Sequence, residues 1–128
     1  MVVREMMMAV RLHAFGEPDV LRYEKAPRPA IGPGEVLVRV HAVGINPPDL
    51  YLRDGYRTMP PEWQPNPAFP IIIGTDVSGV VVAVADDVAG FAVGDEVFAM
   101  VRFPAELMKG SDAYAQCPSS EHSAQLAA

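Results

Sequence analysis

Cysteine, positive charge and long apolar runs are all scarce in this chain. Its single cysteine, Cys117, excludes an internal disulfide. Ten Lys and Arg stand against sixteen Asp and Glu, giving a net charge of -6 spread along the chain, so neither nucleic acid nor an anionic membrane is an expected partner. The apolar segment at residues 6–10 is far shorter than the roughly 20 residues that cross a bilayer. With no signal-peptide pattern at the start, we expect a cytoplasmic protein.

The 128 residues, half of them apolar, suit one domain that buries roughly two-thirds of its unfolded surface. Apolar and polar residues alternate with period two in several segments, which is typical of half-buried strands. Met8, Val10 and Leu12 are expected on the buried face of the first strand. The β-branched run at 77–85 predicts a strand buried on both faces. Strands are expected at residues 8–13, 20–24, 35–43, 77–85 and 97–101.

One short helix is predicted between Asn46 and Gly55. Asn46 can cap it, Pro47 suits its first turn, Asp49 favours its positive end, and Gly55 can stop it. Residues 58–70 hold five prolines around Trp63, which excludes a helix interior or a paired strand. The pattern as a whole predicts a mainly β domain whose closure into a barrel would hide its strand edges.

Four segments in order resemble one known family: PGEVLVRV at 33–40, GINPPD at 44–49, GTDVSGVV at 74–81 and GDEVF at 94–98. They look like the N-terminal domain of zinc-free quinone oxidoreductases and their alcohol dehydrogenase relatives, in the medium-chain dehydrogenase/reductase superfamily. The resemblance implies a mainly β, GroES-like, partly open β-barrel with one or two short helices. It covers residues 8–115, preceded by a flexible leader at 1–7. Residues 116–128 are expected to be an irregular or disordered tail, the product of truncation or a frameshift.

In complete members the barrel is paired with a Rossmann domain that binds NADPH or NADH. No Rossmann domain is expected in this chain, because its only G-x-G, Gly32-Pro33-Gly34, lacks the third glycine and leads into a strand. We therefore do not expect the nicotinamide cofactor to bind this chain alone.

Zinc-dependent relatives place a Cys where this chain has Asn46 and a His where it has Thr75. An amide or a hydroxyl is a poor substitute for thiolate or imidazole on Zn²⁺, so no catalytic zinc is expected. One cysteine also cannot supply the four cysteines of the relatives' structural zinc loop. The resemblance therefore implies no metal site.

By similarity, Asn46 and Tyr51 lie near the nicotinamide and the substrate and are the catalytic candidates. Asn46 can donate a hydrogen bond to a substrate carbonyl, and Tyr51 can donate or pack. Their simpler roles are a helix cap for Asn46 and a core aromatic for Tyr51.

Five further residues are candidates for binding substrate, each with a structural alternative. Asp49 can simply stabilise the first helical turn, and Arg53 can bind an anionic group or be a helix-end cation. Thr75, beside Asp76, can face the cleft or serve turn chemistry. Tyr56 and Trp63 can wall a flat substrate or plug the end of the barrel.

These features predict the substrate-side domain of an NAD(P)H-dependent, zinc-independent oxidoreductase that reduces a quinone or conjugated carbonyl, inactive without its cofactor domain. The alternative is a stand-alone GroES-like module that binds a small apolar ligand or a partner protein without redox activity. Since complete relatives pack the barrel on a second domain, we expect an exposed apolar patch and self-association.

Overall fold

The computed structural model describes residues 5–101 and 119–120. Strands dominate it, with one α-helix and two short 3₁₀ turns, so the prediction of a mainly β fold is confirmed. The strands are β1 (Met6–Leu12), β2 (Leu21–Pro27), β3 (Val36–Gly44), β4 (Ile71–Ile72), β5 (Asp76–Val84), β6 (Glu96–Met100) and β7 (Ser119–Ser120). The helix is α1 (Pro47–Arg53), and the 3₁₀ turns are Pro18–Val20 and Pro61–Trp63.

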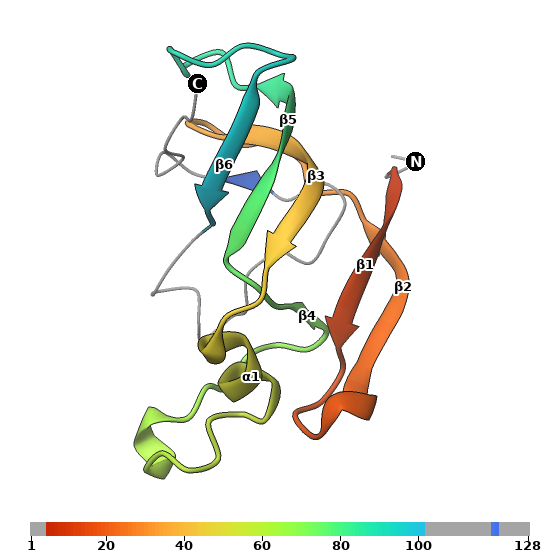
Figure 1. Ribbon diagram of the computed structural model, residues 1–128, viewed down its shortest axis with the longest axis vertical. Coiled ribbons are helices and arrows are strands. Elements are labelled where there is room, and N and C mark those ends of the chain that lie inside the picture. The colour runs from red at the N-terminus through yellow and green to blue at the C-terminus, as the bar shows by residue number, and fades with distance from the viewer. Residues whose placement is uncertain (1–4, 102–118, 121–128) are drawn as a thin grey trace.

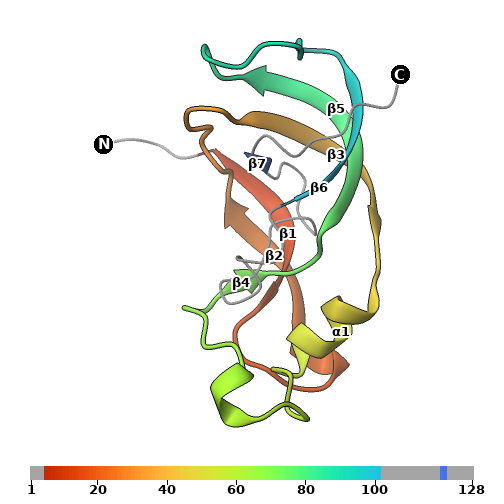
Figure 2. The same ribbon diagram turned by 90° about the vertical axis from the view of Figure 1, so that its left-hand side faces the viewer.

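The strands form two antiparallel sheets, ordered β2-β1-β4 and β6-β5-β3-β7 (Figure 1). Within the described residues no ladder joins the two sheets, so the barrel is not closed. Figure 2 shows β3 and β5 curving past the β1–β2 hairpin, with α1 and the segment after it at one end. The long β3–β5 ladder therefore leads directly to the helix.

The first hairpin forms as predicted, but its buried face differs. β1 pairs with β2 without interruption from Met6 opposite Pro27 to Leu12 opposite Leu21. The strand starts two residues earlier than expected, inside the predicted leader, and its buried residues are Met7, Ala9 and Leu12. The prediction that Met8 and Val10 face the core is wrong. Met7 and Ala9 pack against Ala26 at one end of β1, whereas Leu12 packs against Leu52, Ile71 and Ile73 at the other end. The buried side of the strand therefore changes between Ala9 and Leu12.

β5 is buried on one face only, so the prediction of burial on both faces is wrong. Val77, Gly79 and Val81 are buried, whereas Val80 and Val82 are half-buried. An antiparallel sheet can leave its second face partly open, unlike the parallel sheet that a continuous β-branched run suggests.

β3 and β5 approach each other very closely. A Cβ on Gly79 would lie 2.1 Å from the carbonyl oxygen of Arg39, so only glycine fits there. Val38 of β3 and Val81 of β5 are fully buried and pack with Val36 and Val97 in one cluster. This cluster fixes the ladder that carries the site at its far end.

The proline-rich segment 58–70 contains one 3₁₀ turn and no strand, as its composition predicted. Residues 1–4, 102–118 and 121–128 lie outside the described part, and with them most of the predicted tail and Cys117. Ser119 and Ser120 of that tail form β7, opposite Leu37 and Val36 of β3. In the described residues no helix has the length and apolar character needed to span a membrane.

Candidate functional site

The site begins where β3 ends and α1 starts. The Asp49 carboxylate accepts a hydrogen bond from the backbone N–H of Asn46 (2.8 Å), and the Asp49 N–H donates to the Asn46 carbonyl (2.9 Å). Pro47, whose ring fixes φ, occupies the first helical position. Asp49 is 3% exposed, and its carboxylate binds the backbone at the start of the helix. This is the first-turn role that the sequence offered as an alternative to substrate binding.

The side chain of Asn46 is held by a residue from a different strand. Its Nδ2 donates to Oδ2 of Asp76 over 2.7 Å, although the two residues are thirty positions apart. Asp76 is the first residue of β5 and pairs with Gly44, the last residue of β3. A Cβ on Gly44 would lie 3.0 Å from Asp76 Oδ2, so the glycine leaves room for the carboxylate.

The sequence places Asp76 beside Thr75 but specifies no partner for it. The signal was indirect: Asn46 follows β3 by two residues, and Asp76 opens the strand that pairs with β3. Finding it requires the register of the ladder, because a shift of one residue would put Asp76 on the other face.

The predicted stop of the helix at Gly55 is confirmed. Gly55 has φ of 77° and its N–H donates to the Leu52 carbonyl (3.0 Å), while the Tyr56 N–H donates to the Tyr51 carbonyl (2.7 Å). These two bonds are the Schellman pattern that closes helices. The rings of Tyr51 and Tyr56 contact each other, with centroids 5.9 Å apart.

The two tyrosines differ in exposure. Tyr51 is 53% exposed, so it is not a core aromatic, the alternative role that its sequence position offered. Tyr56 is half-buried, and burial, reinforced by the charge of Asp49 and by Tyr51 and Asp54, raises its pKa above the usual 10.0. The Tyr56 phenol therefore stays protonated and able to donate a hydrogen bond.

Arg53 is tied to the loop after β1. Its Nε donates to the Gly16 carbonyl (3.1 Å), and the Gly16 N–H donates back to the Arg53 carbonyl (3.0 Å). The observed contact is thus a link between α1 and the first hairpin. Nearby, Asp54 Oδ2 lies 3.4 Å from Arg57 Nε, and its buried Oδ1 has no hydrogen-bond partner among the described residues.

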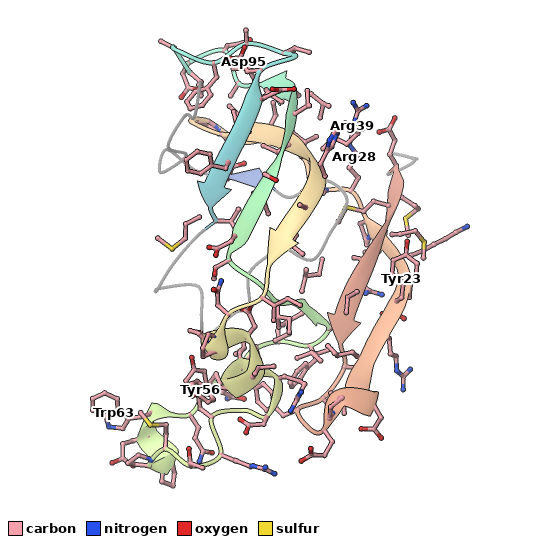
Figure 3. All side chains as sticks on the ribbon, viewed as in Figure 1. Tyr23, Arg28, Arg39, Tyr56, Trp63 and Asp95 are labelled. Carbon is pink, nitrogen blue, oxygen red and sulfur yellow. The ribbon has the colours of Figure 1, made fainter. Side chains whose placement is uncertain are left out.

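Trp63 and Thr75 both follow α1 in the chain and have different surroundings. Trp63 is 67% exposed on its 3₁₀ turn, and Figure 3 shows it at the outer edge of the molecule, beyond Tyr56. The Thr75 carbonyl accepts from the Val101 N–H (2.6 Å), which ties the start of β5 to the end of β6. The structure thus brings Asn46, Asp49, Tyr51 and Tyr56 together around α1.

A hollow of about 570 Å³ adjoins this group. Its lining comes from three neighbouring strands of one sheet: Ala42, Val43, Gly44, Asp76, Val77, Ser78, Phe98, Ala99 and Met100. Gly44 and Asp76 belong both to the hollow and to the contact with Asn46. The polar pair therefore lies at the margin of a mostly apolar depression, the common composition of small-molecule sites.

The residues of this chain that would have to hold zinc or a dinucleotide phosphate fit neither group. Asn46 presents an N–H to Asp76, and an N–H cannot ligate a metal. In the described residues no group of three or more His, Cys, Asp or Glu could hold a metal ion. The N–H of Gly34 in the G-x-G segment donates to Asp87 Oδ1 (2.8 Å) and is not directed to a phosphate.

Comparison with known proteins gives the family. Residues 32–125 match the alcohol dehydrogenase GroES-like domain, which is well over half of the chain. The chain belongs to this family. Within the medium-chain dehydrogenase/reductase superfamily it is a quinone oxidoreductase-like N-terminal domain, so the resemblance stated from the four segments is confirmed.

Three relatives illustrate the match of this GroES-like chain. Rat quinone oxidoreductase is 38% identical over 96 residues, which cover 74% of this chain and 27% of the rat protein. A quinone oxidoreductase from Pseudomonas syringae has a TM-score of 0.80 at 30% identity, over 95% of this chain and 34% of that chain. A mycobacterial protein solved in complex with NADPH has a TM-score of 0.75 at 28% identity, over 95% and 34%. The chain thus spans about a third or less of the length of these relatives.

Proposed function

We propose that this chain forms the substrate side of a zinc-independent, NAD(P)H-dependent oxidoreductase that reduces quinones or conjugated carbonyls. The observation that carries the proposal is the Asn46–Asp76 pair beside the hollow. It puts a hydrogen-bonded amide where zinc relatives place a metal-binding Cys. Similarity to quinone oxidoreductases and to a protein bound to NADPH supports the substrate class and the cofactor.

When bound, a reduced nicotinamide supplies the hydride. The residues of this chain then need only to orient the substrate and stabilise charge on its oxygen, so no nucleophile is required. We assign contact with substrate and nicotinamide to Asn46 and Tyr51. The protonated phenol of Tyr56, in ring contact with Tyr51, is a hydrogen-bond donor for the same oxygen.

The remaining candidates have supporting roles in this proposal. Asp49 holds the backbone of Asn46, and Arg53 holds α1 against the loop at Gly16. Thr75 positions the strand entrance next to Asp76, and the exposed ring of Trp63 offers an apolar surface to a flat substrate. The single cysteine, which cannot form an internal disulfide, favours the cytoplasm as the site of action.

The test uses the protein isolated from its own cells, with NADPH as donor and 1,4-naphthoquinone or a conjugated enone as acceptor. We expect NADPH oxidation that a zinc chelator does not inhibit. Asn46→Ala and Tyr51→Phe at the natural locus should each lower kcat/KM by roughly a hundredfold to a thousandfold, the range for a lost contact to a developing oxyanion. Activity that vanishes with the chelator and returns with zinc would contradict the proposal.

A second candidate is a module that binds a small apolar ligand without reducing it. The exposed rings of Tyr51 and Trp63, and the hollow lined by β3, β5 and β6, are present without any further domain. Saturable binding of 1,4-naphthoquinone to the 128-residue chain, with no NADPH oxidation by the cellular protein, would favour this candidate over the reductase.

A further inference from the structure

The contact between Asn46 and Asp76 has a direction. A carboxylate can only accept hydrogen bonds, whereas an asparagine amide has donors at one end and an acceptor at the other. The amide end that lies 2.7 Å from Asp76 Oδ2 must therefore be Nδ2. The opposite orientation would place two acceptors in contact, without a proton between them.

The position of Asn46 is fixed from two sides. Its backbone N–H is bound by Asp49 of α1, and its side chain is bound by Asp76 of β5. Asp76 in turn passes over Gly44, which has no side chain to obstruct it. Two carboxylates from different elements thus hold one residue, and rotation of the amide would break the second contact.

We propose that Asp76 is a positioning residue, which holds one N–H of Asn46 Nδ2 and leaves the second N–H of that amide to donate a hydrogen bond to the ligand. The proposal rests on the proposed function and adds the polarity of the contact. An oxidised quinone offers only acceptors, whereas the hydroxyl of its reduced product and the carboxamide of nicotinamide both offer donors. Because the remaining N–H is a donor, Asn46 favours the carbonyl of the oxidised substrate, as the sequence suggested, over the hydroxyl of the reduced product.

The positioning of Asn46 by Asp76 is tested by nuclear magnetic resonance on the ¹⁵N-labelled 128-residue chain. We expect the two side-chain amide protons of Asn46 to be well separated and slow to exchange with water. Asp76→Asn, which keeps the shape but allows either amide orientation, should collapse that separation and speed the exchange. Asp87→Asn is the matched control, because Asp87 accepts from a backbone N–H in a distant turn. An Asn46 spectrum that Asp76→Asn leaves unchanged would overturn the proposal.

The hydrogen bond from Asn46 to the ligand is tested with probes of similar shape and opposite hydrogen-bonding polarity, and binding is read from the same spectra. For the product hydroxyl, 1-naphthol is the donor and 1,4-naphthoquinone the acceptor. For the cofactor amide, nicotinamide is the donor and 3-acetylpyridine, which lacks the N–H groups, the acceptor. We expect 1,4-naphthoquinone to bind in preference to 1-naphthol, whereas nicotinamide and 3-acetylpyridine, which both offer a carbonyl oxygen, should bind alike.

Asp76→Asn should reduce that preference by roughly threefold to tenfold, the factor for one ordinary hydrogen bond, and Asp87→Asn should not. A preference for 1-naphthol, or a preference that Asp76→Asn does not change, would overturn the proposed ligand contact. If no probe binds, the proposed contact between Asn46 and the ligand is wrong. The positioning of Asn46 is still decided by its amide spectrum, and the proposed function by NADPH oxidation in the cellular protein.

Discussion

Tyr56 is joined to Tyr51 twice: its backbone N–H donates to the Tyr51 carbonyl over 2.7 Å, and its ring contacts the Tyr51 ring with centroids 5.9 Å apart. The backbone bond ends α1, and the ring contact is the apolar pairing that commonly accompanies this helix ending. One local motif therefore both stops the helix and places two phenols next to each other, close to the Asp49 that holds Asn46.

This helix ending depends on Gly55, and Gly55→Ala should destabilise the fold strongly. The residue has φ of 77°, where a Cβ costs about 1–2 kcal/mol. The new Cβ would also lie 2.7 Å from Phe15 Cδ2, and the Phe15 ring is itself held edge-on by Phe69. We expect a total loss of roughly 2–5 kcal/mol in the free energy of unfolding, measured by urea denaturation.

Gly90→Ala is the matched control, because Gly90 has φ of 88° but open space around its Cβ position. It should lose only the backbone part, about 1–2 kcal/mol. Equal losses in the two variants would show that the contact with Phe15 is not important.

The raised pKa of Tyr56 gives a signature at high pH. Because burial and nearby negative charge disfavour its phenolate, absorbance near 295 nm should show one phenol titrating above the usual 10.0, and Tyr56→Phe should remove it. The stabilisation from the neutral phenol is complete below pH 10 and is lost as the pH rises through the folded-state pKa. Tyr23→Phe, at a residue that is 69% exposed, should leave this late titration in place.

The local features of this fold could be predicted from the sequence, because neighbouring residues determine them. Pro47 and Gly55 marked the two ends of α1, and period-two alternation marked the β1–β2 hairpin. The buried face of β1 could not be predicted, since it depends on which cluster each end meets. The Asp76–Asn46 contact likewise depends on the register of β3 against β5, which no local pattern specifies.

Self-association is expected through β6, which is an edge strand of the described sheet and exposes two large apolar side chains. Phe98 and Met100 are 48% and 52% exposed on the side that lines the hollow. Sedimentation velocity should show a mass that rises with concentration, and Phe98→Lys should reduce that rise. Val93→Lys, at an exposed turn residue, is the control and should have little effect. A chain that stays monomeric at high concentration would contradict this expectation.

Gly44 should matter because of the room it leaves for Asp76. In Gly44→Ala the new Cβ would lie 3.0 Å from Asp76 Oδ2 and 3.1 Å from its Cβ, so the carboxylate must shift and its bond to Asn46 must weaken. We expect a loss of about 1–2 kcal/mol in the free energy of unfolding. The cost should fall to a few tenths of a kcal/mol when Asp76 is already Ala, because the side chain that the methyl displaces is then absent. Gly32→Ala, whose nearest contact would be 3.5 Å, provides the control for the effect of an added methyl group. A Gly44→Ala cost that is the same with and without the Asp76 side chain would show that Gly44 serves some other purpose than admitting that carboxylate.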